Sequence, residues 1–169
     1  DLQDYSWKYV ISPYRKSQNV YQCPANPSRE LEDYNTATAL QGDGVPDYMS
    51  SYAVNRGSGM DGPFIDPHPG RGEPLSVGLN EIVAPAQTIG IVESTSIFTD
   101  FVVTNLRWAN PNPTPADTNG NLFAGHIGMS NFLFMDGHIK AMKPLATLDA
   151  ADGGSGTVNM WTNAGKPFV

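Results

Sequence analysis

The side chains able to do chemistry are few: three histidines, one cysteine and scattered carboxylates among 169 residues. Zinc sites use three or four Cys, His or acidic ligands at recognisable spacings, and the sequence contains no HxH, HExxH or CxxC. Cys23 precedes Pro24 with no histidine near it in sequence, and no GxSxG nucleophile turn occurs. The pattern therefore argues against a zinc site and against an enzyme. His68, in the Pro-rich segment Asp66–Gly70, is expected to be exposed to solvent.

A polar cluster around His126 is the sharper hypothesis. His126 precedes an apolar hairpin, and Glu93 lies near the end of the apolar segment Gln87–Ser94. In an antiparallel hairpin the start of the first strand lies about 16 Å from the turn, so Asp136 is too far away to bond His126 directly. Glu93 is the better partner, since a buried carboxylate needs a hydrogen-bond donor. In the alternative interpretation, Glu93 is exposed at a strand end and Asp136 only forms the turn.

Two acidic loops suggest weak calcium binding. Asp149 and Asp152 lie in the Gly-rich loop Asp149–Ser155, and a second carboxylate pair lies in Asp43–Asp47. Calcium takes six to eight hard oxygen ligands, several of them from a flexible backbone. Neither loop has the complete DxDxDG pattern, so solvated turn carboxylates are the alternative. Calcium, more readily at Asp149–Ser155, is the one cofactor that the sequence suggests.

The strongest local prediction is a β-hairpin over Asn131–Met142. Two β-prone runs are separated by Asp136 and Gly137, a pair typical of a type I′ turn with positive φ at both positions. That turn places Phe134 opposite Ile139. Four apolar side chains would then share the core face: Phe132, Phe134, Ile139 and Ala141.

The remaining elements are expected to be short, because 17 Gly and 14 Pro interrupt the chain. The spacing of Leu2, Tyr5 and Tyr9 predicts the end of a helix over Asp1–Tyr14, stopped by Pro13. The sequence thus predicts one α+β domain over residues 1–169, with an antiparallel sheet and little helix. Further strands are expected at Ser51–Asn55, Gln87–Ser94, Phe98–Val103 and Thr157–Trp161, and long loops at Arg56–Pro74 and Asn110–Asn121.

Composition narrows the function classes. The net charge is -7, and only ten Lys and Arg are scattered along the chain, which argues against nucleic-acid binding. An apolar content of 40% argues against a disordered acidic chain. No apolar run approaches the roughly 18 residues that a membrane span requires.

The order of these motifs resembles a known family. His126, nine intervening residues, then Asp136 and Gly137 resemble the C-terminal hallmark of planctomycete-type prepilin-like proteins. Three further segments are similar to pieces of that family and occur in the same order: Trp7–Ser28 with its Cys-Pro, Ser51–Asn55, and Pro85–Glu93.

The resemblance implies a type IV pilin or type II secretion pseudopilin-like head, in which an antiparallel sheet packs on an N-terminal helix. It implies a structural subunit exported to the cell envelope, periplasmic or at the cell surface. A membrane helix outside these 169 residues would anchor it, and its partners would be copies of itself or other pseudopilins. It also implies structural roles for the motif residues and calcium in the head. The alternative is an adhesin or glycan-binding ectodomain on the same anchor, using the loops and Trp7, Trp108 and Trp161.

Overall fold

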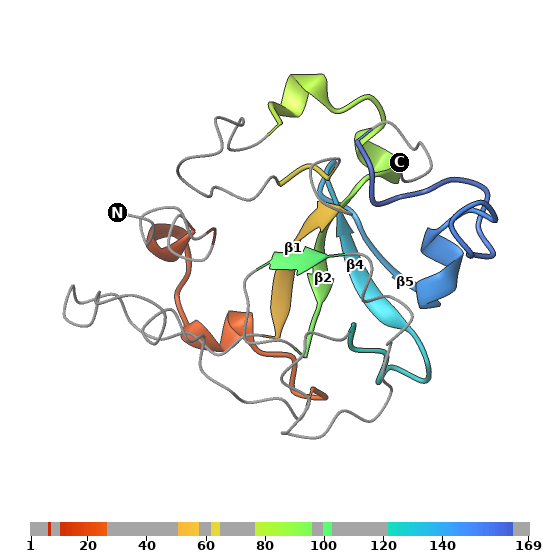
Figure 1. Ribbon diagram of the computed structural model, residues 1–169. Coiled ribbons are helices and arrows are strands. Elements are labelled where there is room, and N and C mark those ends of the chain that lie inside the picture. The colour runs from red at the N-terminus through yellow and green to blue at the C-terminus, as the bar shows by residue number, and fades with distance from the viewer. Residues whose placement is uncertain are drawn as a thin grey trace, which may run out of the picture.

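The structure is a computed structural model that describes Trp7 and residues 11–26, 51–57, 62–64, 77–95, 100–102 and 122–163. Its strands form one five-stranded sheet in the order β3-β1-β2-β4-β5 (Figure 1). β1 and β3 run parallel, and the other neighbours are antiparallel. The strands are β1 (Tyr52–Gly57), β2 (Ile89–Glu93), β3 (Asp100–Val102), β4 (Ser130–Phe134) and β5 (Ile139–Met142).

The central strand β2 lies between β1 and β4, and four of its five residues are buried. Val92 lies opposite Ala53 of β1 and Phe132 of β4, so these three side chains line one face of the sheet. Gly90 occupies an irregularity in the β2–β4 ladder, where an added Cβ would lie only 2.7 Å from Met135 Sδ. The core cluster on this sheet consists of Ala53, Ile89, Val92, Leu122, Phe132, Phe134, Leu148 and Trp161.

The C-terminal segment closes the core. Trp161 is fully buried and meets the ring of Phe132 edge to face, with centroids 6.1 Å apart. The buried Asn55 amide of β1 donates to the carbonyls of Ile89 at 2.8 Å and Trp161 at 2.9 Å. Asn55 Oδ1 accepts from the N–H of Gly57 at 2.8 Å, so this polar side chain is satisfied inside the core. The Asn55 side chain thereby links β1 to β2 and to Trp161, near the C-terminal end of the described residues.

The predicted α+β fold with an N-terminal helix on the sheet is wrong. The described elements are a mostly antiparallel sheet and 3-10 helices of three or four residues, and none of the helices in these ranges reaches seven residues. Of the expected helix at Asp1–Tyr14, the described residues show one turn, with Ile11 N–H donating to Trp7 O at 3.1 Å, and then a 3-10 helix. Pro13 offers no N–H to a continuing α-helix, in agreement with the change to a 3-10 helix at Ser12–Tyr14. The 3-10 helices are η2 (Ser12–Tyr14), η3 (Gln18–Tyr21), η4 (Leu79–Glu81), η5 (Pro85–Gln87) and η7 (Pro144–Thr147).

Several sequence predictions fall outside the described residues. Those for His68, Trp108, Asp43–Asp47 and Asn110–Asn121 are among them. Within the part of the chain that is described, no helix combines the length and the apolarity needed to cross a membrane.

The predicted hairpin is confirmed, because β4 pairs with β5 in antiparallel fashion and Gly137 has a φ of 94°. Its predicted register is wrong by one residue: Leu133, not Phe134, lies opposite Ile139. Phe134 instead pairs with His138, donating its N–H to the His138 carbonyl at 2.9 Å.

A three-residue loop explains this shift. Gly137 N–H donates to Phe134 O at 2.9 Å and closes a turn, while Asp136 keeps the ordinary negative φ. This is a type I turn followed by a left-handed glycine, rather than the expected type I′ turn. A slip of one residue moves side chains to the opposite face. Ile139 and Ala141 therefore leave the predicted core face, and Ile139 is 70% exposed.

Candidate functional site

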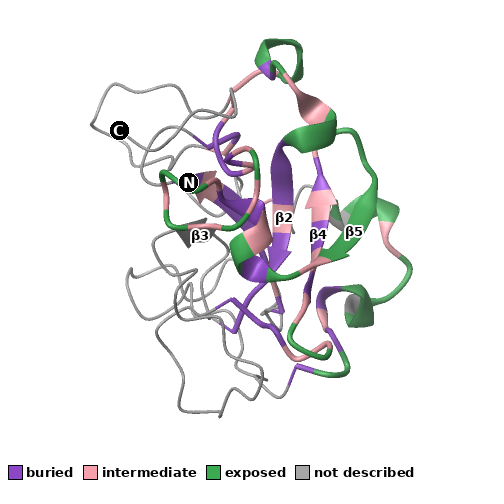
Figure 2. Cartoon of the chain, turned by 90° about the vertical axis from the view of Figure 1, so that its right-hand side faces the viewer, coloured by how far each residue is buried: buried purple, intermediate pink, exposed green. Residues whose placement is uncertain are grey.

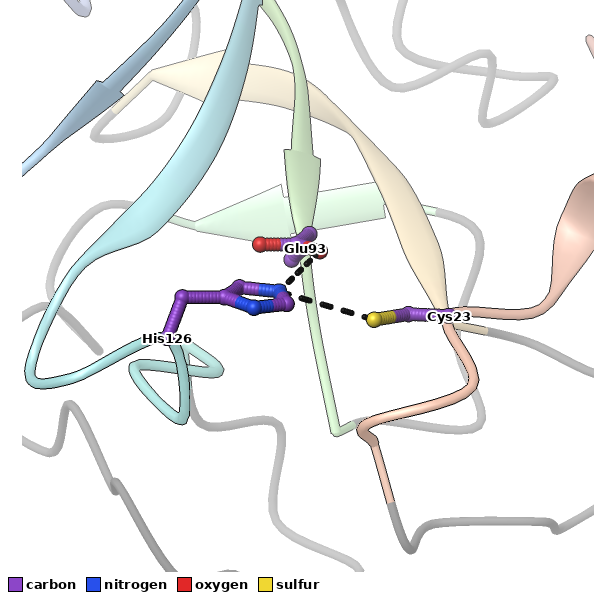
Figure 3. A group of neighbouring side chains, drawn as sticks. All are labelled: Cys23, Glu93 and His126. Carbon is purple, nitrogen blue, oxygen red and sulfur yellow. Dashed lines mark hydrogen bonds and ion pairs between the residues drawn. The ribbon is translucent and has the colours of Figure 1, made fainter.

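Three side chains from distant parts of the sequence converge at the end of β2. Cys23 Sγ lies 3.5 Å from His126 Nε2, and that nitrogen lies 2.9 Å from Glu93 Oε1. All the ligand atoms of this Cys23–Glu93–His126 cluster lie within 4.8 Å of one another. Figure 3 shows the three side chains pointing toward one another from the N-terminal segment, from β2 and from the loop before β4.

Glu93 is the buried centre of the cluster. Strand alternation places it on the face opposite Val92, away from the apolar core. It is 1% exposed, yet both carboxylate oxygens are satisfied: Oε1 accepts from His126 Nε2, and Oε2 accepts from the N–H of Asn131 at 2.8 Å. The His126–Glu93 contact predicted from the sequence is therefore present. It links β2 to both the loop before β4 and the start of β4.

A tight turn presents the imidazole of His126. The N–H and carbonyl of His126 exchange hydrogen bonds with those of Met129 at 3.2 and 3.1 Å. The two residues between them have positive φ, 58° at Ile127 and 75° at Gly128, which defines a type I′ turn. The ring of Phe123 meets the imidazole edge to face, with centroids 5.3 Å apart. Turn and aromatic contact together fix the direction of Nε2.

Cys23 is held in place by a turn of its own. The N–H of Asn26 donates to Cys23 O at 3.0 Å, and the Asn26 amide donates to the carbonyl of Ser94, next to Glu93, at 2.8 Å. Pro24 fixes φ within this turn. The buried Asn26 side chain therefore fastens the cysteine segment to the end of β2.

Burial is the main influence on the thiol. It raises the pKa of Cys23, and the nearby carboxylate of Glu93 raises it further, while the N–H groups of Ala25 and Asn26 act in the opposite direction. Burial, with the charges of Cys23 and Glu93, also raises the pKa of Tyr52 to about 12. In the protein alone the thiol is thus protonated at neutral pH, which disfavours it as a nucleophile.

The geometry also differs from a nucleophilic relay. In a catalytic triad the nucleophile and the carboxylate contact different nitrogens of the same imidazole. Here Cys23 Sγ and Glu93 Oε1 both contact His126 Nε2. A proton cannot pass from the sulfur through the ring to the carboxylate. Instead, the Cys23 sulfur, the Glu93 carboxylate oxygen and the His126 nitrogen point toward one another.

The other motif residues lie at the opposite end of β4. Asp136 Oδ1 accepts from the His138 ring at 2.6 Å and from the His138 N–H at 3.1 Å. These bonds lower the pKa of the Asp136 carboxyl, although the pair is exposed. The His138 ring stacks on Phe134 with centroids 4.3 Å apart. Asp136 and Gly137 thus shape the hairpin turn, and Asp136 does not belong to the buried cluster.

The candidate calcium loop is tied together by its own hydrogen bonds. Asp149 Oδ1 accepts from the N–H of Asp152 at 3.1 Å, and Asp152 Oδ2 accepts from the Asn159 amide at 2.6 Å. Gly153 adopts a φ of 79° within this loop. Calcium binding at Asp149 and Asp152 stays a prediction.

Cys23 is the member of the cluster that the sequence did not predict. It lies 103 residues before His126, so no local spacing joins them. The available signal was Cys23-Pro24 itself, which predicts a turn but names no partner.

Comparisons with protein-family models, with curated proteins and with solved structures find no match. The resemblance to prepilin-like proteins therefore remains a prediction.

Proposed function

We propose that the chain is a structural subunit, exported to the cell envelope, that assembles with copies of itself through the edges of its sheet. The role is that of a pseudopilin, without the helix-on-sheet fold expected of one. The observation that carries the proposal is the exposed edge strand β5, whose residues Ile139, Lys140 and Ala141 are all exposed (Figure 2).

The β5 backbone is suited to strand addition. Phe134 and His138 form a hydrogen-bonded pair, and such pairs alternate with non-hydrogen-bonded ones along an antiparallel ladder. The N–H and C=O groups of Ile139 and Ala141 therefore point away from β4. No described strand lies beyond β5, and such an edge is a template for a strand of another chain.

The opposite edge of the sheet supplies the partner surface. Among the described strands, β3 is the other outer one. β5 carries Lys140, and Lys143 follows it, in a chain of net charge -7. Pairing β5 of one copy with β3 of the next is a heterologous contact, which repeats into a filament when the rotation does not close.

The test follows the full-length protein in cells that make it. We expect it in the fraction of sheared surface filaments, and we expect Ile139→Lys to remove it from that fraction. Ala141→Pro should do the same while leaving the β4–β5 ladder intact, because the Ala141 N–H faces outward. Ile127→Lys is the matched control, since Ile127 is a 96% exposed isoleucine away from the edge. Recovery only from the cytoplasm, or assembly of Ile139→Lys at the wild-type level, would contradict the proposal.

The alternative of a glycan-binding head finds less support in the tryptophans. Trp161 is fully buried, and Trp7 is partly buried against Tyr21, with ring centroids 5.9 Å apart. Trp161 therefore offers no open aromatic face on which a sugar would stack, and Trp108 lies outside the described residues.

A further inference from the structure

The Cys23–Glu93–His126 cluster combines a thiol sulfur, a carboxylate oxygen and an imidazole nitrogen. Zn²⁺ accepts all three donor types, usually in tetrahedral coordination. Calcium and magnesium require oxygen ligands and would leave the sulfur and nitrogen unused. The chemistry of the donors therefore selects a zinc-like ion over the calcium considered for the acidic loop.

Two of the three separations lie near that geometry, and Cys23 Sγ lies within 4.8 Å of a Glu93 oxygen. Bonds of about 2.3 Å to sulfur and about 2.0–2.1 Å to nitrogen place these atoms about 3.5 Å apart in a tetrahedral site. Cys23 Sγ and His126 Nε2 are 3.5 Å apart. The tetrahedral nitrogen–oxygen separation is about 3.3 Å, against 2.9 Å between His126 Nε2 and Glu93 Oε1. A shift of a few tenths of an ångström would replace that hydrogen bond by two metal bonds.

Each ligand is also oriented by groups outside the cluster. Asn131 N–H holds Glu93 Oε2, which leaves Oε1 for a metal, and Phe123 packs against the His126 ring. Asn26 fastens the Cys23 turn to Ser94 O. Such supporting contacts set ligand direction in metal sites. They come from three separate segments, so the site is built by the fold and not by a local motif.

We propose that Cys23, Glu93 and His126 form a mononuclear zinc site, with water as the fourth ligand. The His126 side chain is 30% exposed, so solvent reaches the cluster from the side of this residue. Binding releases the thiol proton of Cys23 to solvent, and the His126 proton moves from Nε2 to Nδ1 so that Nε2 can bind the metal. The ion would clasp the N-terminal segment, β2 and the loop before β4.

The test titrates the purified 169-residue chain, stripped with chelator, with ZnCl₂ by calorimetry and with CoCl₂ by absorption. We expect one metal per chain, a rise in melting temperature, and a thiolate-to-cobalt charge-transfer band in the near ultraviolet. Cys23→Ser should abolish the band. Glu93→Gln and His126→Ala should each weaken zinc binding at least tenfold. His138→Ala is the matched control, because it removes the histidine of an exposed carboxylate pair and should leave binding unchanged.

Cys23→Ser changes only one atom and is decisive even if the other two variants fail to fold. Absence of stoichiometric binding in the wild type, or a charge-transfer band that survives Cys23→Ser, would overturn the site. Neither result bears on assembly through β5, which is tested separately.

Discussion

His126 meets Glu93 just before β4, and His138 meets Asp136 just after it. The exposed pair has the shorter contact, 2.6 Å against 2.9 Å. In the exposed pair the side chains are 42% and 38% exposed, whereas Glu93 of the other pair is only 2% exposed. Water can replace either partner in the exposed pair, but it cannot easily replace the donor lost from a buried carboxylate. Burial, and not the contact distance, therefore determines how much each pair contributes to the stability of the fold.

The turns beside the two pairs also differ, in their backbone strain. The turn beside His138 places a glycine at its single left-handed position, Gly137. The turn beside His126 places Ile127 at a φ of 58°, where a β-branched residue is an outlier. The buried pair is thus presented by the strained turn, and the exposed pair by the relaxed one.

The largest expected effect comes from breaking the buried pair. Glu93→Gln and His126→Ala should each lower the free energy of unfolding by about 1–3 kcal/mol. His126→Ala leaves a buried Glu93 oxygen without its donor, and Glu93→Gln puts an NH2 donor against either the Asn131 N–H or the His126 ring. Urea melts with chelator present should give a coupling energy of at least about 0.5 kcal/mol in the double-mutant cycle.

The parallel cycle with Asp136→Asn and His138→Ala is the control and should give coupling near zero. Strictly additive losses at Glu93 and His126 would mean that the two side chains do not interact.

Gly137→Val is expected to have the next largest effect. Its φ of 94° disfavours any side chain with a Cβ, at about 1–2 kcal/mol. No atom lies within 4 Å of the added Cβ, so the loss comes from the backbone alone. Gly137→Asn should cost less, because asparagine populates this region. Equal urea midpoints for the valine variant and the wild type would refute the assignment.

Relieving the backbone strain at Ile127 should stabilise the folded protein. Ile127→Asn should raise the free energy of unfolding by about 1 kcal/mol, because asparagine followed by Gly128 suits a type I′ turn. Ile127 is 96% exposed, so little packing is lost. Thermal melts measure the gain, with Ile127→Val as the control that keeps the β-branch. A loss of stability in Ile127→Asn would show that the isoleucine is needed for another reason.

The smallest effect is expected at Asp136, whose pKa is lowered by the N–H and ring of His138. A lowered carboxyl pKa contributes stability above its ordinary value of 3.8, and that stability is lost as the pH falls through the folded-state pKa. Asp136→Asn should therefore slightly flatten the decline in urea midpoint below about pH 4. An unchanged acid profile would assign the decline to other carboxylates.

The two regions also differ in how far the sequence predicts them. The hairpin β4–β5 follows from neighbouring residues, and so does the positive φ of Gly137. Its register does not, because a two-residue and a three-residue loop share the same Asp-Gly signal. The Glu93–His126 contact was predicted because a buried carboxylate requires a donor, which is a physical demand and not a spacing.

Long-range contacts explain the rest. Cys23 reaches His126 across 103 residues, and no periodicity encodes that approach. The helix expected at Asp1–Tyr14 rested on three aromatic and apolar positions, Leu2, Tyr5 and Tyr9, all of which lie outside the described residues. Local signals predicted strands and turns, while the cluster depends on the completed sheet.

The amide of Asn55 has a consequence for the timing of folding. Its partner carbonyl at Trp161 lies 106 residues further along the chain. At a synthesis rate of about 5–20 residues per second, Asn55 waits roughly 5–20 seconds for that residue to be made. Until then the Trp161 side chain cannot cap Phe132, and the apolar face stays open. The core therefore cannot close before Trp161 has been made, and the earlier strands must wait for that residue with their apolar face uncovered.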